Sequence, residues 1–274
     1  FDRYLLNRAQ AAGATVWLGS GAVGLSPDGV WVMRAGESLH VRARVVVGAD
    51  GARSQLGAWI GSRNREYVLA AQYELACVQP ASPGALVEVY LHPRLAGGYG
   101  WFFPKGATAN VGVGINPALA PRAELPALLR WFVAALEAAG KVQGRPLRAT
   151  GGWLPVGGLV PRVAHGRFLL AGDAAGVTHP ITGAGIYHAV ISGTLAGAAA
   201  AAAVQEGQRA LEEYPRRLSE QLGDHLGWAV ARRRERDRSW HEQGDFSSLV
   251  HRSWVALPGF QAGRREYASG GVAV

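Results

Sequence analysis

The string FLLAGDAAGVTHPITGAGIYHAVISG, residues 168–193, constrains the fold of this sequence more than any other segment. An apolar run ends at Gly172 and Asp173, a loop containing Gly and Pro follows, and a helical pattern begins near Ile186. A carboxylate at the end of a strand can accept hydrogen bonds from sugar-type hydroxyl groups. The free amides of a helix N-terminus stabilise negative charge. The string therefore predicts a strand, loop and helix that bind a large planar ligand. The alternative is an ordinary Gly- and Ala-rich turn.

A second string, RVVVGADGARSQLG at residues 44–57, likewise has an apolar run that leads into Gly and Asp residues. A β-branched run leads into Gly48, Asp50 and Gly51. An isolated Asp-Gly pair is weak evidence, because it is also a common turn sequence. Its presence together with the first string makes a shared ligand site more specific.

Residues 19–24 fit the pattern G-x-G-x-x-G, but their context is wrong for a dinucleotide-binding loop. That motif requires a helix at its third glycine. Here the turn sequence Ser26-Pro27-Asp28-Gly29 follows, and then an apolar run. We interpret residues 19–24 as a Gly-rich strand and turn.

Hydrophobic periodicity gives the remaining elements. Residues 1–13, 122–139, 185–204 and 207–241 are predicted helical, and 66–116 is predicted to form a largely antiparallel sheet. Shorter strands are predicted at Thr15–Leu18, Val30–Arg34, Arg44–Gly48 and Arg167–Ala171. In the helix at 122–139 one face collects five apolar side chains, namely Leu125, Leu128, Leu129, Phe132 and Leu136.

Aromatic side chains are concentrated in the segment GYGWFFPKG at residues 98–106. Its aromatic residues are Tyr99, Trp101, Phe102 and Phe103. Such a surface can hold an apolar chain, since each buried methylene contributes about 0.8 kcal/mol. The alternative is a hydrophobic strand in the core of a sheet.

The two Gly-rich strings resemble the second and third flavin fingerprints of the FAD-dependent monooxygenase and reductase superfamily, which has the p-hydroxybenzoate hydroxylase-like fold. Within it, the chain most resembles the geranylgeranyl reductase family, over residues 1–240 or so. FDRYLLNRAQAAGA is similar to the helix after the family's N-terminal βαβ unit. GYGWFFPKGATANVGVGI is similar to the signature PxxYxWxFP, with Ala96 in place of the first Pro.

The resemblance implies an α/β fold, in which a partial Rossmann-like FAD-binding domain carries an inserted antiparallel β-sheet substrate domain and a helical C-terminus. The expected parts are residues 1–62 and 156–206 for the FAD-binding domain, 63–155 for the substrate sheet and 207–274 for the helical region. The sequence begins at Phe1, and the family's phosphate-binding glycine loop is expected upstream of it, so the chain is expected to be N-terminally truncated.

The resemblance also implies site residues. The residues expected to bind FAD are Val23, Asp50, Gly51, Gly172, Asp173, Pro180, Gly183, Gly185 and Ile186. The residues expected to bind substrate are Tyr99, Trp101, Phe103 and Pro104. His179 is a candidate catalytic proton donor. The alternative for His179 is a loop residue that is hydrogen-bonded to backbone.

The function implied is saturation of isoprenoid double bonds by flavin hydride transfer, with electrons from NAD(P)H or a ferredoxin-type donor. Expected substrates carry a prenyl chain, as a diphosphate, a lipid, a quinone or a chlorophyll precursor. One alternative is an FAD-dependent monooxygenase of the same superfamily. The other is a non-catalytic remnant that binds prenyl lipid.

The composition limits the kinds of molecule that this protein is expected to bind. The net charge is +8, and a basic surface favours phosphates or anionic lipid heads. No aromatic-basic array indicates nucleic acid. The single cysteine, Cys77, and the lack of a ligand cluster argue against a metal site. Residues 186–204 are long enough to span a bilayer, but small residues fit a packed helix better. We expect a cytoplasmic protein with contact to membrane surfaces.

Overall fold

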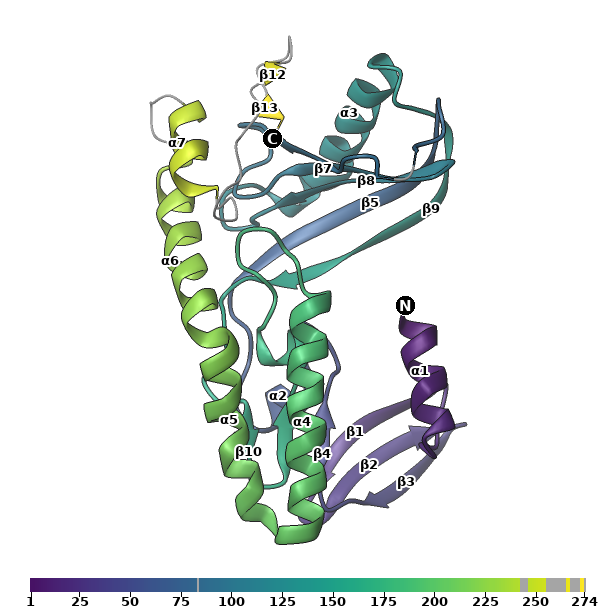
Figure 1. Ribbon diagram of the computed structural model, residues 1–274, viewed down its shortest axis with the longest axis vertical. Helices are drawn as coiled ribbons and strands as arrows, with labels where there is room; N and C mark the ends of the chain where they lie inside the picture. The colour runs from purple at the N-terminus through teal and green to yellow at the C-terminus, as the bar shows by residue number, and fades with distance from the viewer. Residues whose placement is uncertain (83, 242–245, 255–264, 267–271, 274) are drawn as a thin grey trace.

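The computed structural model describes residues 1–274 apart from 83, 242–245, 255–264, 267–271 and 274 (Figure 1). The chain forms two sheet-containing regions, with a column of helices alongside both. The N-terminal elements are α1 (Asp2–Ala11), β1 (Ser20–Ser26), β2 (Gly29–Arg34) and β3 (Glu37–Arg42). The three strands form an antiparallel sheet in the order β1-β2-β3.

The prediction of a strand at Thr15–Leu18 is wrong, because β1 begins only at Ser20. Gly19 has a φ of +65°, which interrupts the extended backbone before it can pair with β2. The interpretation of residues 19–24 as part of a strand, followed by a turn and another strand, is confirmed, since β1 pairs directly with β2 from Ser20 to Ser26. The strand β3 was not predicted. It is reached through a tight turn in which Ala35 and Gly36 both have positive φ, as two-residue hairpins require.

A second small sheet joins segments far apart in the sequence. It contains β4 (Val46–Gly48), β10 (Ala164–His165) and β11 (Phe168–Leu170) in the order β10-β11-β4. β11 runs parallel to β4, with Leu169 opposite Val47. The short helix α2 (Gln55–Trp59) follows β4. The two predicted ligand-binding strings therefore leave the same edge of one sheet.

The largest sheet has seven strands in the order β12-β13-β6-β7-β8-β5-β9, and all of its pairs are antiparallel. The strands are β5 (Tyr67–Cys77), β6 (Glu88–Leu91), β7 (Gly100–Lys105), β8 (Thr108–Ile115), β9 (Val142–Pro155), β12 (Arg265–Glu266) and β13 (Val272–Ala273). A 3₁₀ turn (Arg122–Glu124) precedes α3 (Leu125–Ala138). The five predicted apolar side chains of α3 are all buried, and they pack on one face of this sheet.

The described residues between 172 and 253 are mainly helical. Their elements are the 3₁₀ turn η2 (Gly172–Ala175), α4 (Ile186–Glu206), the 3₁₀ turn η3 (Gln208–Glu212), α5 (Glu213–Leu218), the π-helical turn η4 (Ser219–Gly223), α6 (Asp224–Arg238) and α7 (Phe246–Ser253). In Figure 1 the helices α5 and α6 form one column, which runs from beside α4 to the seven-stranded sheet. The predicted fold class is confirmed: α/β, with an antiparallel sheet inserted between the two segments of a parallel pair.

Helix α4 is the helix in the described part of the chain that is long and apolar enough to cross a membrane. Core helices also meet this criterion of length and composition. The side chains that α4 buries are His188, Ser192, Ala196 and Ala203, all at intervals that bring them to one side of the helix. The Ser192 hydroxyl accepts a hydrogen bond of 2.9 Å from the amide of Gly172, which fastens α4 to the end of β11.

Candidate functional site

The loop between β11 and α4 is folded tightly around Asp173. Gly172 and Gly176 adopt φ values of +59° and +76°, which favour glycine. The Thr178 hydroxyl donates to Oδ1 of Asp173 at 2.5 Å. Asn64 Nδ2 donates both to the carbonyl oxygen of Asp173, at 2.8 Å, and to that of Ala52, at 3.0 Å. Asn64 therefore ties together the two predicted ligand-binding strings.

The start of α4 is suited to an anionic group. Its N-cap residue, Gly185, offers no side-chain cap, and the first helical bond runs from the Ala189 amide to the Gly185 carbonyl. The amides before Ala189 therefore lack partners within the helix. A Cβ atom at Gly185 would lie 3.3 Å from Asp173 Oδ1 and 3.3 Å from Thr178 Oγ1. Ile186 is 71% exposed. Backbone amides are thus accessible beside a carboxylate, as a ligand with both hydroxyl and anionic groups requires.

His179 holds the segment 180–184 in shape. Its amide donates to the Ala184 carbonyl at 2.9 Å, and its carbonyl accepts from the Gly183 amide at 2.9 Å. Its ring nitrogen Nδ1 accepts from the amides of Ile181 and Thr182, at 3.3 and 3.2 Å. These contacts match the second interpretation of His179 from the sequence, that of a loop residue hydrogen-bonded to the backbone. Its catalytic role stays a prediction.

Three imidazole rings from different segments lie close together beside this loop. The ring centroid of His179 lies 5.0 Å from that of His225 on α6 and 6.4 Å from that of His188 on α4. Burial, reinforced by the charges of His225 and His188, lowers the pKa of His179 to about 4. His179 is therefore neutral near pH 7. Its Nδ1 lone pair remains available to the two loop amides.

The structure gives Asp50 a definite local role. Its carboxylate accepts hydrogen bonds from the amides of Gln55 and Leu56, at 2.7 and 3.1 Å, and from the Ser54 hydroxyl at 2.5 Å. These are contacts to the free amides at the N-terminus of α2. Gly51 follows with a φ of +82°.

Val23 lies on β1, at a bulge between Ala22 and Gly24, and is about half exposed. Its part in binding a cofactor stays a prediction, as do those of the other expected FAD-binding residues.

An apolar pocket of about 580 Å³ lies between the seven-stranded sheet and the loop 180–184. Tyr99, Trp101 and Phe103 line it, so the structure brings together three of the four predicted substrate-binding residues. Their rings form a row, with centroids 5.8 Å apart for Tyr99 and Trp101 and 6.3 Å apart for Trp101 and Phe103. The opposite wall includes Pro180 and Gly183.

The aromatic surface is narrower than the sequence suggested, because side chains on β7 alternate between faces. Phe102 points to the other face, where it is 8% exposed and joins the core with Leu75 and Phe132. Pro104 does not line the apolar pocket either. It lines a second hollow of about 390 Å³, together with Cys77 and Lys141.

Several residues that line the pocket were not predicted. Gln72 on β5 accepts a hydrogen bond of 3.2 Å from the Trp101 indole nitrogen, which fixes the ring. Thr150 and Leu154 reach the pocket from β9. The alternation of residues 68, 70 and 72 was visible in the sequence, but the pairing of β5 with β9 was not. Trp101 also lies over Gly112, where a Cβ atom would approach the indole to 2.1 Å.

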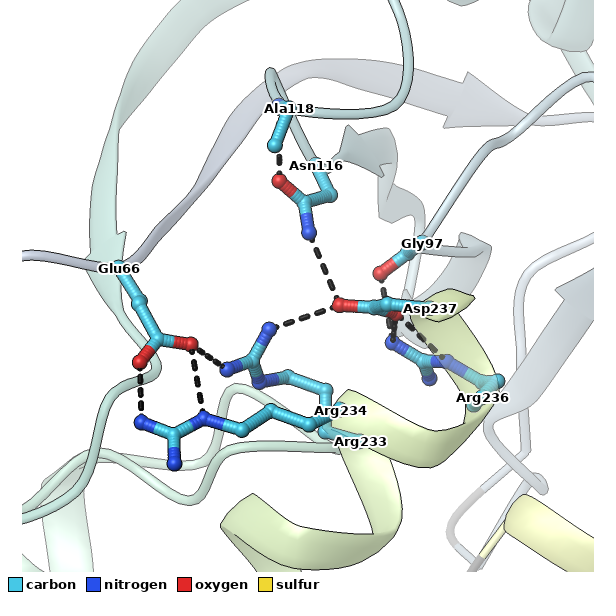
Figure 2. Close-up of polar contacts among 8 residues, drawn as sticks. All are labelled: Glu66, Gly97, Asn116, Ala118, Arg233, Arg234, Arg236 and Asp237. Carbon is cyan, nitrogen blue, oxygen red and sulfur yellow. Dashed lines mark hydrogen bonds and ion pairs between the residues drawn. The ribbon is translucent and has the colours of Figure 1, made fainter. Parts of the chain in front are cut away.

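A network of charged residues joins α6 to two segments near the pocket, namely the loop before β7 and the segment before β5 (Figure 2). Arg236 donates to the Gly97 carbonyl at 2.7 Å, on the loop that precedes Tyr99. Arg233 pairs with Glu66, which lies just before β5, and donates to Asp237 at 2.7 Å. Figure 2 shows how these side chains reach from one helix to both the sheet loop and the segment before β5.

The charges of this network are deeply buried. Arg233 and Arg236 are each 2% exposed, and Asp237 is 8% exposed. Asp237 accepts from both guanidinium groups and also from Asn116 Nδ2, at 2.9 Å. Burial lowers the pKa of Arg236, while Asp237 opposes the shift. Nε of Arg233 and Nη1 of Arg236 have no partner within the described residues. Within the described residues Arg236 therefore has Asp237 as its carboxylate partner, while Arg233 shares Asp237 and also pairs with Glu66.

Comparison with known proteins agrees with this geometry. Residues 66–153, which form most of the seven-stranded sheet, match the family described as the geranylgeranyl reductase catalytic domain. A digeranylgeranylglycerophospholipid reductase of Methanocaldococcus jannaschii is 34% identical over 239 residues, which is 82% of this chain and 60% of the relative. The chain is therefore similar in sequence to the geranylgeranyl reductase family over most of its own length. It spans about 60% of the length of this curated relative.

Solved structures point to the same similarity. A geranylgeranyl bacteriochlorophyll reductase-like protein from Thermoplasma acidophilum has a TM-score of 0.77 and 27% identity, covering 92% of this chain and 65% of its own. The flavin-dependent halogenase CmlS has a TM-score of 0.67 and 21% identity, covering 94% of this chain and 49% of its own, which shows a shared fold. The Rossmann-like flavoprotein fold expected from the sequence is therefore confirmed.

Proposed function

We propose that this chain forms the substrate-binding and flavin-facing part of an FAD-dependent oxidoreductase that saturates double bonds of an isoprenoid chain. The observation that carries the proposal is the apolar pocket of about 580 Å³, bounded on one side by the rings of Tyr99, Trp101 and Phe103 and on the other by the loop 180–184. Its volume is in the range of ligand pockets in general. The name of the relative from Methanocaldococcus jannaschii, a reductase of a geranylgeranyl lipid, supports the same substrate class.

The residues present are compatible with FAD. Asp173 offers a carboxylate to the ribityl hydroxyl groups, and the accessible amides at the start of α4 offer hydrogen bonds to the anionic edge of the ring system. Gly183 and Gly185 leave room for a planar group to approach the backbone. When bound, FAD would supply a hydride to one alkene carbon, and the neighbouring carbon would receive a proton.

The chain's own contribution is binding, orientation and exclusion of water. The aromatic row holds the isoprenoid chain, with Trp101 kept at a fixed angle by its hydrogen bond to Gln72. The hydroxyl of Tyr99 donates to the Thr182 carbonyl, so the row and the loop stay in contact. Burial raises the pKa of Tyr99 to about 12, and it therefore remains a neutral donor at physiological pH.

The finer parts of the proposal concern the surroundings of the site. The electrons would come from NAD(P)H or a ferredoxin-type donor. The protein would work in the cytoplasm, in contact with the membrane that holds its substrate. The net charge of +8 supports attraction to anionic lipid surfaces.

Mass spectrometry of a prenyl substrate tests the reaction. Protein loaded with FAD and reduced without oxygen is incubated with geranylgeranyl phosphate, and a gain of H₂ per double bond is expected. Gain of an oxygen atom in air would instead identify a monooxygenase. A colourless protein that binds the prenyl ligand without taking up FAD would identify a non-catalytic lipid-binding protein.

A further inference from the structure

The pocket face of the seven-stranded sheet changes from apolar to charged just beyond the aromatic row. On β5 and β9 the last residues that line the pocket are Gln72 and Thr150, which lie opposite each other. Two residues further along β5, Glu74 lies opposite Asn110 on one side and Arg148 on the other. Directly opposed residues of antiparallel strands place their side chains on the same face. Arg148 therefore belongs to the rim of the pocket at the end away from the loop 180–184.

The charges at this rim do not balance. Lys105 Nζ lies 2.8 Å from Glu74 Oε1, and Thr108 donates to the same oxygen at 3.1 Å. The hydrogen bond from Lys105 lowers the pKa of Glu74, so this carboxylate is ionised and already paired. In the described part of the chain Arg148 has no ion pair within 4.0 Å, and its side chain is exposed. The charge of Arg148 also lowers the pKa of Glu74, but Lys105 and Arg148 together face this one carboxylate, so one positive charge is in excess beside the apolar pocket.

We propose that Arg148 binds the phosphate group at the head of the isoprenoid substrate and thereby sets which double bonds reach the loop 180–184. This inference rests on the proposed function, and it adds the residue that determines the register of the chain. A guanidinium group can donate two parallel hydrogen bonds to a phosphate, which gives direction as well as affinity. The apolar row between Arg148 and the loop would hold the hydrocarbon part.

The spacing along β5 predicts which part of the chain reacts. Ala70 and Val68, which line the end of the pocket near the loop, precede Glu74 by four and six residues. At about 3.3 Å per residue these intervals span roughly 13–20 Å. An extended chain advances about 1.2 Å per bond, with roughly four bonds per isoprene unit. A substrate whose phosphate sits at Arg148 would therefore present its third or fourth isoprene unit to the loop.

Isothermal titration calorimetry on the whole chain tests the head-group contact, with geranylgeranyl phosphate and geranylgeraniol as probes. Arg148→Gln should weaken binding of the phosphate about tenfold and leave binding of the alcohol unchanged. Arg148→Lys should lie between Arg148→Gln and the wild type. The matched control is Arg130→Gln on α3, which removes the same charge from the opposite face of the sheet and should change neither affinity.

Four results would overturn the inference. Unchanged phosphate affinity in Arg148→Gln would do so, and so would an equal loss for the alcohol. A loss confined to anionic vesicles, with the affinity for dissolved geranylgeranyl phosphate intact, would assign Arg148 to the membrane surface instead. If inorganic phosphate alone binds wild type as tightly as the prenyl phosphate, Arg148 holds a free anion and sets no register. If wild-type protein binds neither prenyl ligand, the proposed function itself fails.

A second readout concerns the products of the FAD-loaded enzyme. Wild type should reduce the double bonds farthest from the phosphate first. Arg148→Gln should give a mixture of positions, because the chain then lacks a fixed head. The same distal preference in both proteins would contradict the role of Arg148 in setting the register, even if reduction itself proceeds.

Discussion

The Tyr99 hydroxyl donates a hydrogen bond to the carbonyl oxygen of Thr182, although the two residues are 83 positions apart in the sequence. The bond joins the aromatic face of the seven-stranded sheet to the loop that leads into α4. A Cβ atom at Gly183 would lie only 3.7 Å from the same hydroxyl, so sheet and loop are in close contact there. Substrate and cofactor would meet at this contact.

Replacing Tyr99 by Phe should loosen the loop while keeping the aromatic ring. The expected loss of unfolding free energy is about 1 kcal/mol, since one hydrogen bond is lost and a partly buried carbonyl is left unpaired. Hydrogen exchange of the amides at 181–184 should accelerate, while exchange along β5 should not change. Uniform protection of both segments in Tyr99→Phe would show that the bond does not hold the loop.

Trp101 and Phe102 are neighbours that should respond in opposite ways to truncation. Trp101→Ala should weaken binding of a prenyl ligand about tenfold, because roughly 50–60 Å² of apolar contact is worth about 1.4 kcal/mol. Phe102→Ala should instead destabilise the fold by about 3–5 kcal/mol, since it opens a cavity in the core. Urea unfolding and ligand titration of both variants measure the difference. The assignment of the two faces fails if Trp101→Ala is the more destabilising change.

Asp237→Asn should be severely destabilising, by about 3–5 kcal/mol, because two buried guanidinium groups would lose their only shared carboxylate. The control is Arg234→Gln. Arg234 lies on the same helix as Asp237, and the change breaks its exposed ion pair with Glu66. That change should cost less than about 1 kcal/mol. Chemical denaturation at neutral pH compares them. Equal small losses would mean that the buried network contributes little.

The lowered pKa of His179 predicts that the folded protein loses stability in mild acid. Its folded pKa of about 4 lies below the ordinary value of 6.5, so the neutral ring favours folding. The resulting stability is complete above pH 6.5, decreases as the pH falls from 6.5 to about 4, and changes no further below that. The size of the decrease is about 3 kcal/mol or less.

The variant His179→Asn separates this titration from others. An Asn side-chain oxygen can accept from the loop amides but does not change charge. Its unfolding free energy should therefore vary less between pH 6.5 and 4 than that of wild type, while His188, whose pKa is also lowered by burial, still contributes. Identical pH profiles for the two proteins would remove His179 from the explanation.

Much of the fold was predictable because its signals are local. The apolar stripe of α3 has helical spacing, and every predicted side chain of that stripe is buried. The strand, loop and helix around Asp173 were predictable for the same reason, since Gly residues mark each reversal of the backbone. Local alternation also contained the information that Phe102 and Pro104 face away from Trp101, but the sequence interpretation did not apply it.

The rest depended on which strands pair. Gln72 and Thr150 are adjacent only because β5 lies beside β9, and no local pattern specifies that neighbour. The role of Asn64, which bonds to the backbone of both Ala52 and Asp173, likewise needed the three-dimensional structure. Asp50 looked like a ligand-binding residue from its Gly-rich context, while its contacts in the structure are to the first amides of α2.

The attachment of α6 to two segments near the pocket has a consequence for how a ligand enters and leaves the pocket. Arg233 holds the segment before β5, and Arg236 holds the loop before β7. These two segments therefore cannot move away from α6 unless the contacts of both buried guanidinium groups break. Under the proposed function, a prenyl chain would then have to fit into a pocket whose two sides keep a fixed spacing. A lipid that bears two prenyl chains would then have to bind with one chain at a time and dissociate before its second chain could enter the pocket.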